Sequence, residues 1–450
     1  MKKVITYGTF DLLHQGHINL LKRAKELGDY LIVGVTSENY DISRGKLNVN
    51  QSLLKRIDNV KQTGLADEII VEEYLGQKIN DIQKHSIDIF TIGSDWYGQF
   101  DYLKQFCEVV YLPRTQGISS TQLRNNKNSV LELGVVGNGR IAKRFVKEAK
   151  YVSGINIDSV FGRNEENLNK FCSNFNLAEY YTDYDKFLTK VDAVYIALPH
   201  ILHYEYAKKA LLAGKHVLCE KPITLNVSET QELYNIAKTK KLVLQEAIKT
   251  AYSPGFNKLI NIARSGIIGD IKDVDATFTK LINDKTLREY DSSQGGGALS
   301  ELGSYPLLII TKLLGTNPNS IHHIVMNDSE KNVDVMNKVS FIYSNATATA
   351  NTGIGIKKEG CCIISGTKGY IYVPAPWWLT EYFEIRFEDL NKTQKFFEKF
   401  DGDGLRYELA DFLSNINANT KSYKLSEAES IFISSVIENF KNNKSNITYI

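Results

Sequence analysis

The chain has 450 residues and nearly balanced charge, with 54 lysines and arginines against 52 aspartates and glutamates and a formal net charge of +2. Its length predicts two or three domains, since domains average roughly 150 residues. Balanced charge gives no field that would attract nucleic acid or a membrane surface, so we expect small-molecule partners, no nucleic acid and no membrane.

The cysteines and the first residues indicate the cellular compartment of the protein. The five cysteines show no spacing of metal ligands, and their odd number fits reduced thiols better than a disulfide framework. The start, "MKKVITYGTF", has no apolar segment of a secretion signal, and no window reaches the roughly 18 apolar residues of a membrane span. These features predict a cytoplasmic protein without a protein-bound metal.

The first part of the chain alternates β-rich runs with helical patterns. Strands are predicted at 2–8, 29–37, 87–95 and 107–113, and an amphipathic helix at 17–28. Such alternation is typical of a parallel sheet with helices on both faces. We predict an α/β, Rossmann-like domain over residues 1–127.

A polar stretch, "NNKNSV", has the composition of a linker, and a second α/β pattern follows it. Its predicted strands are 131–137, 155–162, 191–199 and 215–222. Beyond about Pro254 the runs become longer and alternate, as in "KVSFIYSNATATA", which predicts a large, mainly antiparallel sheet. We expect a second Rossmann domain at 128–250 and a C-terminal α+β domain at 251–450.

The segment "GTFDLLHQGH", residues 8–17, places a glycine turn before a predicted helix. Backbone amides at a helix N-terminus favour phosphate, so Gly8 and Thr9 are candidate phosphate contacts. His14 and His17 are three residues apart and share a helical face. Two imidazoles beside a phosphate site can donate hydrogen bonds to charge that develops on a triphosphate as it is attacked.

With "GSDWYGQFD" at 93–101 and "RTQGISST" at 114–121, this segment resembles the HxGH cytidylyltransferases, in particular the glycerol-3-phosphate cytidylyltransferases. The resemblance implies transfer of a cytidylyl group from CTP, accompanied by Mg²⁺, to a polyol phosphate, without a covalent intermediate. It implies that His14 and His17 stabilise the transition state. The implied nucleotide and substrate contacts are Gly8, Thr9, Asp11, Lys46, Arg56, Asp95, Arg114, Ser119 and Thr121.

A second glycine turn lies in "GVVGNGRIA", between a predicted strand and a predicted helix. Gly137, Gly139 and Ala142 form a G-x-G-x-x-A pattern, which in this context lets backbone approach a dinucleotide pyrophosphate. Arg163 follows the next strand, where an acidic residue would select NAD. An arginine there favours NADP(H) over NAD(H), although Arg163 as an ordinary loop cation remains an alternative.

The motif "EKP", Glu220 to Pro222, directly follows a predicted strand, and "GGGALSELGSY" occurs later at 295–305. With the glycine turn, these residues resemble the Gfo/Idh/MocA oxidoreductases over about residues 131–450. The resemblance implies that Glu220 and Pro222 border the cofactor and that Lys221, Glu301 and Tyr305 are catalytic. Glu301 replaces a commoner aspartate, and the motif Pro199-His200-x-x-His203 is also altered, which leaves the substrate open.

The combination predicts a bifunctional enzyme that reduces a carbonyl precursor with NAD(P)H and activates the resulting polyol phosphate with CTP. Glycerol 3-phosphate is the favoured acceptor, and a precursor of teichoic acid or capsule polymers is the implied product. A cytidylyltransferase with a silent NADP-sensing or assembly module is the alternative, and a reductase acting on the CDP-linked product is a third possibility. Both families commonly self-associate, so we expect a homo-oligomer.

Overall fold

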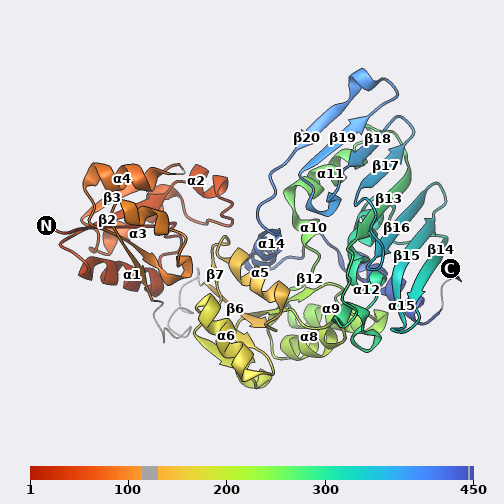
Figure 1. Cartoon of the computed structure of the whole chain (residues 1–450), viewed down its shortest axis with the longest axis horizontal. Helices are drawn as coiled ribbons and strands as arrows, with labels where there is room; N and C mark the ends of the chain where they lie inside the picture. Colours follow the sequence, from red (N-terminus) through yellow and green to blue (C-terminus); the bar gives the residue numbers. More distant parts are fainter. Residues whose placement is uncertain (75, 114–129, 444–445) are drawn as a thin grey trace. The chain divides into compact units, whose positions relative to one another are not determined.

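The computed structural model describes residues 1–74, 76–113, 130–443 and 446–450. The chain packs as two compact units, Met1–Ala193 and Val194–Ile450. The division falls inside strand β10 (Ala193–Ile196), within the second predicted domain. Figure 1 labels the helices and strands of both units.

The first sheet of unit 1 has five parallel strands in the order β3-β2-β1-β4-β5. Its central strand pairs Val4 with Leu31 on one side and with Ile89 on the other. The strands are β1 (Lys3–Gly8), β2 (Tyr30–Thr36), β3 (Glu68–Glu72), β4 (Ile89–Gly93) and β5 (Glu108–Leu112), and the helices are α1 (Gln15–Glu26), α2 (Glu38–Ser43), α3 (Leu53–Gln62) and α4 (Gln77–His85). The predicted parallel α/β domain is confirmed, and β3 is a strand that the sequence analysis missed.

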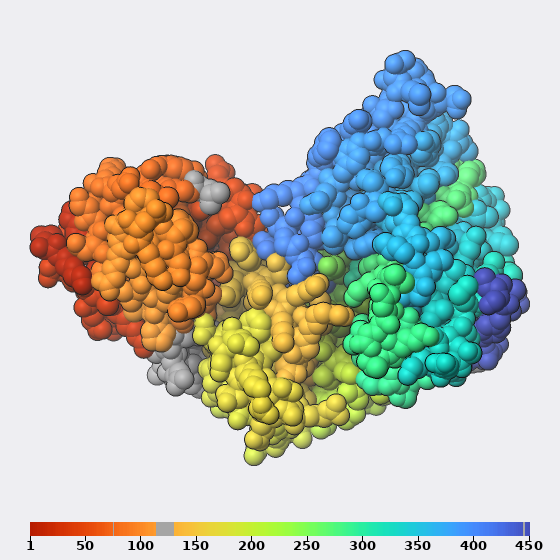
Figure 2. Space-filling view, viewed as in Figure 1, coloured from red at the N-terminus to blue at the C-terminus, as the bar shows by residue number. Residues whose placement is uncertain are grey.

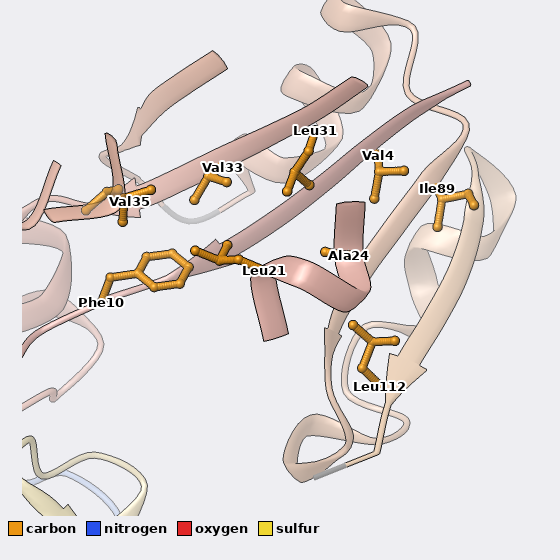
Figure 3. Packing of buried hydrophobic residues seen from close by; sticks show 10 residues of the cluster. Val4, Phe10, Leu21, Ala24, Leu31, Val33, Val35, Ile89 and Leu112 are labelled. Carbon is orange, nitrogen blue, oxygen red and sulfur yellow. The ribbon is translucent and has the colours of Figure 1, made fainter. Parts of the chain in front are cut away.

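Alternate residues of β1 enter two separate cores, one on each face of this sheet. Val4 packs with Leu21, Ala24 and Leu31 in one core, drawn in Figure 3, and Ile5 packs with Phe90 in the other. A strand covered on both faces reads as a nearly continuous apolar run, as "VIT" within "KKVITYG" does. The sheet therefore holds the turn after β1 rigidly at its carboxyl edge.

Unit 1 continues with a second set of parallel strands, in which β6 pairs with β7 and β8, and β8 pairs with β9. The elements are β6 (Leu131–Val136), α5 (Arg140–Ala149), β7 (Ile155–Asn156), β8 (Ser159–Phe161), α6 (Glu165–Phe175), β9 (Glu179–Tyr181) and α7 (Tyr184–Leu188). Strand β6 leads directly into the glycine turn and α5, as the sequence predicts.

Unit 2 begins with strands that lie in the order β12-β11-β10, with β11 and β12 parallel. The elements are α8 (His203–Leu212), β11 (His216–Glu220), α9 (Val227–Lys240), β12 (Leu244–Ala247), α10 (Lys249–Tyr252) and α11 (Pro254–Arg264). The motif at 220–222 directly follows β11, so it stands at the carboxyl end of a parallel strand, where ligands of α/β sheets bind.

The rest of unit 2 is a nine-stranded sheet in the order β20-β19-β18-β17-β13-β16-β15-β14-β21. It contains β13 (Ile271–Thr279), β14 (Ser320–Asp328), β15 (Val333–Ile342), β16 (Thr347–Gly353), β17 (Cys362–Gly366), β18 (Tyr370–Val373), β19 (Tyr382–Arg386), β20 (Gln394–Phe397) and β21 (Asn446–Tyr449), with the helices α12 (Ala298–Leu302), α13 (Ser304–Leu314), α14 (Leu405–Ala418) and α15 (Glu427–Lys441). Two neighbouring pairs, β13 with β16 and β14 with β21, are parallel, and the other pairs are antiparallel, which confirms the predicted mainly antiparallel sheet.

Helices cover one face of this large sheet. Helix α13 packs against β13 and β16, and α12 packs against β15 and β16. In Figure 2 the C-terminal residues, in dark blue, lie at the surface beside the teal strands, where β21 pairs with β14. No helix among the described residues is long and apolar enough to span a membrane.

Candidate active sites

The first candidate site is built on the turn between β1 and α1. Phe10 and Leu12 have the positive backbone angles φ 50° and 46°, so the chain reverses sharply before the helix begins. His14 is the N-cap of α1, and its Nδ1 accepts a hydrogen bond from the amide of Gly16 at 3.1 Å. The amide of His14 in turn donates to Nδ1 of His17 at 3.4 Å, which completes a reciprocal cap.

The two histidine rings are stacked, with centroids 3.9 Å apart and planes at 28°. Burial, with His14 and Lys46 close by, lowers the pKa of His17 well below its usual value, so this ring is neutral at neutral pH. Since Nδ1 of each ring accepts a backbone N–H, each Nε2 carries the proton that a substrate oxygen could receive as a hydrogen bond. Gly16 permits this arrangement, because a Cβ there would lie 2.9 Å from Cε1 of His14.

A buried carboxylate organises the threonine of the same turn. Asp41 accepts hydrogen bonds from Thr36 at 2.9 Å and from Thr9 at 3.2 Å. Arg44 pairs with Asp41 and also donates to Oγ1 of Thr9 at 2.7 Å. Sequence reasoning missed Arg44, which lies in no motif, although it lines the same pocket as Thr9 and the two histidines.

Asp11 is buried and anchors a neighbouring segment. Its two carboxylate oxygens accept the backbone amides of Asn50 and Gln51, each at 2.9 Å. It therefore ties the 50–51 segment to the turn after β1.

Arg56 lies in the interior, in contrast to the predicted phosphate contact. Its side chain is 0% exposed and donates from Nη1 to the carbonyl oxygens of Thr9 and Thr36, each at 2.8 Å. It also lies 3.5 Å from a carboxylate oxygen of Asp41. Arg56 therefore stabilises the turn between β1 and α1, because its guanidinium is bonded to backbone carbonyls and lies beside Asp41.

One pocket of unit 1 brings most of the other predicted residues together. Its walls include Gly8, Thr9, Asp11, His14, His17, Lys46 and Asp95. Arg114, Ser119 and Thr121 lie outside the described residues. The pocket also contains Tyr7, Glu72 and Lys78, which sequence reasoning missed.

These three additional residues form a buried cluster. Lys78 pairs with Glu72, and its Nζ lies 4.5 Å from the ring centroid of Tyr7. The hydroxyl of Tyr7 donates to Asp81 at 2.8 Å. Their scattered positions on β1, β3 and α4 explain why no local motif reveals them.

The glycine turn at the end of β6 has the conformation that the pattern requires. Gly137 has a φ of 103°, which strongly favours glycine, and Gly139 is the N-cap of α5. Ala142 is fully buried in α5, and Arg163 is exposed just after β8. The turn leaves backbone amides of the α5 N-terminus free of side-chain caps, which suits a dinucleotide phosphate.

In unit 2, Lys221 contacts the helix that carries the later motif. Its Nζ donates to the backbone carbonyl of Glu301 at 2.8 Å and lies 5.9 Å from the ring centroid of Tyr305. Burial raises the pKa of Tyr305, so its hydroxyl keeps its proton at neutral pH. The structure thus brings Lys221, Glu301 and Tyr305 together as predicted, and their roles stay a prediction.

The carboxylate of Glu301 is held by Arg288, which no motif marks. The two guanidinium nitrogens lie 2.9 and 3.1 Å from the two carboxylate oxygens. His200 Nδ1 lies 3.7 Å from the same carboxylate and 3.3 Å from the carbonyl oxygen of Gly295. Burial, with Lys221 nearby, lowers the pKa of His200 well below its usual value, so this ring is neutral.

His203 and Glu220 support the segment around Lys221. The His203 ring nitrogens lie 2.8 Å from the carbonyl of Pro222 and 2.9 Å from that of Leu198. Burial lowers its pKa to about 4, so the neutral ring donates to one of the two. Glu220 accepts the hydroxyl of Tyr195 at 2.6 Å, and burial raises its pKa despite the adjacent Lys221.

Among the residues that the structure describes, no group of three or more histidines, cysteines, aspartates or glutamates could hold a metal ion.

Both candidate sites lie in regions that are similar to known protein families. A "Cytidylyltransferase-like" family model matches residues 5–126. A glycerol-3-phosphate cytidylyltransferase of Bacillus spizizenii is 53% identical over 130 residues, which are 29% of this chain and 100% of that protein. The chain belongs to the cytidylyltransferase family. Its cytidylyltransferase domain carries the stacked histidines.

Two further family models match later parts of the chain. The model "Oxidoreductase family, NAD-binding Rossmann fold" matches residues 131–248, and "GFO/IDH/MocA C-terminal domain" matches residues 256–372. The chain thus joins a nucleotidyltransferase to an oxidoreductase, and the Rossmann model supports a nicotinamide cofactor for the second half.

Relatives of the oxidoreductase half act on varied compounds. A dTDP-3,4-didehydro-2,6-dideoxy-alpha-D-glucose 3-reductase of Streptomyces violaceoruber is 33% identical over 208 residues, which are 46% of this chain and 60% of that enzyme. The structure of KijD10, a 3-ketoreductase of Actinomadura kijaniata in complex with NADP and TDP-benzene, superposes with a TM-score of 0.65 at 22% identity, and the match covers 71% of this chain and 99% of KijD10. At that identity the likeness shows the fold alone.

Proposed function

We propose that the cytidylyltransferase domain transfers a cytidylyl group from CTP to a polyol phosphate, with glycerol 3-phosphate as the favoured acceptor, and releases pyrophosphate. The observation that carries this proposal is the pair of stacked imidazoles at the start of α1, in which both Nδ1 atoms accept backbone N–H groups, so that each ring carries its proton on Nε2. The relative that is 53% identical over its whole length, a glycerol-3-phosphate cytidylyltransferase, supports this acceptor.

The residues of this site supply position and charge rather than a nucleophile. His14 and His17 donate to oxygens of the triphosphate as charge grows on the leaving pyrophosphate. Arg44 and Lys46 add positive charge at the wall of the pocket. Mg²⁺ would enter with CTP, bound by its phosphates.

The oxidoreductase half would reduce a carbonyl compound with NADPH, which yields the polyol phosphate that the first domain uses. The turn at Gly137 and Gly139 would hold the cofactor pyrophosphate, and Arg163 would favour a 2′-phosphate. The Lys221 ammonium group, or the Tyr305 hydroxyl, would give the carbonyl oxygen its proton as hydride arrives. The product would serve the synthesis of a teichoic acid or capsule polymer.

Pyrophosphate release by the full-length protein tests the first activity. CTP and Mg²⁺ are supplied with glycerol 3-phosphate, ribitol 5-phosphate or other polyol phosphates, and we expect the fastest release with glycerol 3-phosphate. A clear preference for another polyol would replace the acceptor, and no release with any of them would refute cytidylyl transfer to this class.

NADPH oxidation with a panel of ketose and aldose phosphates tests the second activity. Lys221→Ala should abolish NADPH oxidation and leave pyrophosphate release unchanged. Lys240 is exposed at the end of α9, and Lys240→Ala should change neither rate. NADPH binding without oxidation of any carbonyl compound would favour a silent sensing module. Oxidation only with a CDP-linked ketone would place reduction after cytidylyl transfer, and the dTDP-sugar reductase among the relatives makes this a specific second candidate.

A further inference from the structure

A chain of buried polar side chains in unit 2 leads from the large sheet to the helix that contacts Lys221. It consists of His323 on β14 and of Asn337 and Asp334 on β15, with Asp334 nearest the helix. These side chains are 0%, 0% and 5% exposed, respectively. None of them lies in the motifs at 220–222 or 295–305. Buried polar groups of this kind are costly unless they satisfy one another, so their arrangement requires an explanation.

Asp334 is joined directly to the N-terminus of α12. Its Oδ2 accepts the backbone amide of Leu299 at 2.9 Å. Its Oδ1 lies against Gly297, where a Cβ would come within 2.1 Å of that oxygen. Gly297 has a φ of 115°, and its amide donates to the carbonyl of Glu289 at 2.9 Å. The carboxylate therefore fixes both the first turn of α12 and the glycine segment before it.

Asn337 and His323 fix Asp334 in turn. Nδ2 of Asn337 donates to Oδ2 of Asp334 at 3.2 Å, and Nδ1 of His323 donates to Oδ1 of Asn337 at 3.0 Å. The His323 ring stacks on Phe440, with centroids 5.1 Å apart. The links run from α12 to β15, along β15, across to β14 and, through the ring contact, to Phe440 of α15, so the chain supports α12 from behind.

Helix α12 has only five residues, and it sets the surroundings of Lys221. The carbonyl of Glu301 receives the Lys221 ammonium group at 2.8 Å, and the Glu301 carboxylate holds Arg288. A helix this short cannot keep its own position, because it has few internal hydrogen bonds. A shift of α12 would move the acceptor of Lys221 and the partner of Arg288 together.

We propose that Asp334, held by Asn337 and His323, is a positioning residue that locks α12 and thereby sets the place of the Lys221 ammonium group. The inference rests on the proposed function only in taking Lys221 as a group that meets the substrate. The hydrogen-bond chain itself involves no substrate, so it can be tested without one.

The test measures how fast an amine reagent, trinitrobenzenesulfonate, modifies Lys221 in the full-length protein, by mass spectrometry of the peptide that contains it. Lys240, exposed at the end of α9, is the internal reference. Asp334→Ala removes the acceptor for Leu299, and we expect the Lys221 rate to rise by about three- to tenfold, the equivalent of one lost hydrogen bond. Asp334→Asn keeps an oxygen that can accept the same amide, so its rate should stay near that of the wild type.

Asp275→Ala is the matched control, since Asp275 lies in the same sheet on β13, which β16 separates from β15, and accepts a hydrogen bond from Asn351 at 3.1 Å. An unchanged Lys221 rate in a folded Asp334→Ala protein, or an equal rise in Asp275→Ala, would overturn the proposal. If Asp334→Ala does not fold, Asn337→Ala takes its place, because it removes only the support of Asp334, and a smaller rise of about twofold is expected.

Where a reducible carbonyl compound has been found, Asp334→Ala should also lower kcat for NADPH oxidation more than it raises KM. Pyrophosphate release by the first domain should not change. If no carbonyl compound is reduced, the oxidoreductase proposal fails, but the labelling result still decides whether Asp334 positions Lys221.

Discussion

The imidazole ring of His14 lies on that of His17 with the centroids 3.9 Å apart, and both rings direct Nδ1 at backbone amides. Two positive charges at this separation would repel each other, and burial lowers the pKa of His17 further. The hydrogen bonds to Nδ1 therefore fix the tautomer of both rings, with the proton on Nε2.

Replacement of either ring should remove a donor that acts in the transition state. We expect His14→Ala and His17→Ala each to lower the turnover of pyrophosphate release by about 10²-fold or more, with a smaller change in KM for CTP. Steady-state kinetics check this, with circular dichroism to confirm the fold. A folded variant with more than about a tenth of wild-type turnover would contradict the role.

Gly16→Ala should separate activity from stability. Alanine favours a helix over glycine by about 0.5–1 kcal/mol, so the thermal midpoint should not fall on that account. The new methyl group would lie 2.9 Å from Cε1 of His14, however, and must displace that ring. We expect turnover to fall by about tenfold, the equivalent of one misplaced hydrogen bond. Gln15→Ala, at the exposed preceding position, is the control and should leave turnover unchanged.

Arg56→Met should act on stability. The substitution leaves the carbonyls of Thr9 and Thr36 without their donor and removes one of the two guanidinium groups beside Asp41, which keeps Arg44, so we predict a loss of about 2–4 kcal/mol in the free energy of unfolding. Denaturant unfolding measures the loss. Lys46→Met is the contrast, since it should raise KM for CTP with little change in stability. A stable Arg56→Met protein with a raised KM would restore the predicted phosphate contact.

Glu246→Gln should change how stability depends on pH. Glu246 is 1% exposed, and burial raises its pKa from 4.5 to about 7. Between pH 4.5 and 7, Glu246 is therefore protonated in the folded state but ionised in the unfolded state. The contribution of this proton to the free energy of unfolding is full below pH 4.5 and is lost as pH rises through 7.

The glutamine variant has no such proton. Relative to the wild type, its free energy of unfolding should increase between pH 4.5 and 8 by up to about 3 kcal/mol. Thermal or denaturant unfolding at a series of pH values measures the difference, and a difference that does not vary with pH would refute the raised pKa.

The sequence by itself determined the three-part α/β organisation and both chemical signatures. Each of these is local: strands alternate with helices, Gly137 and Gly139 lie in a glycine turn, and His14, His17 and Lys221 lie in short motifs that resemble those of two known families. Local patterns also explain why β3, with its half-buried run "EIIVE", was missed. A strand with a weak apolar signal is recognised only once β2 pairs with it.

The burial and the hydrogen-bond partners of the charged side chains follow only from the tertiary structure. The sequence predicts Arg56 as a phosphate contact, yet packing encloses its side chain completely, while Arg44, twelve residues earlier, reaches Thr9 at the wall of the pocket. Arg288 and Asp334 meet α12 from segments that no motif marks. The reason is physical: burial and hydrogen-bond partners arise from contacts between residues far apart in the chain, and a sequence pattern carries no record of those distances.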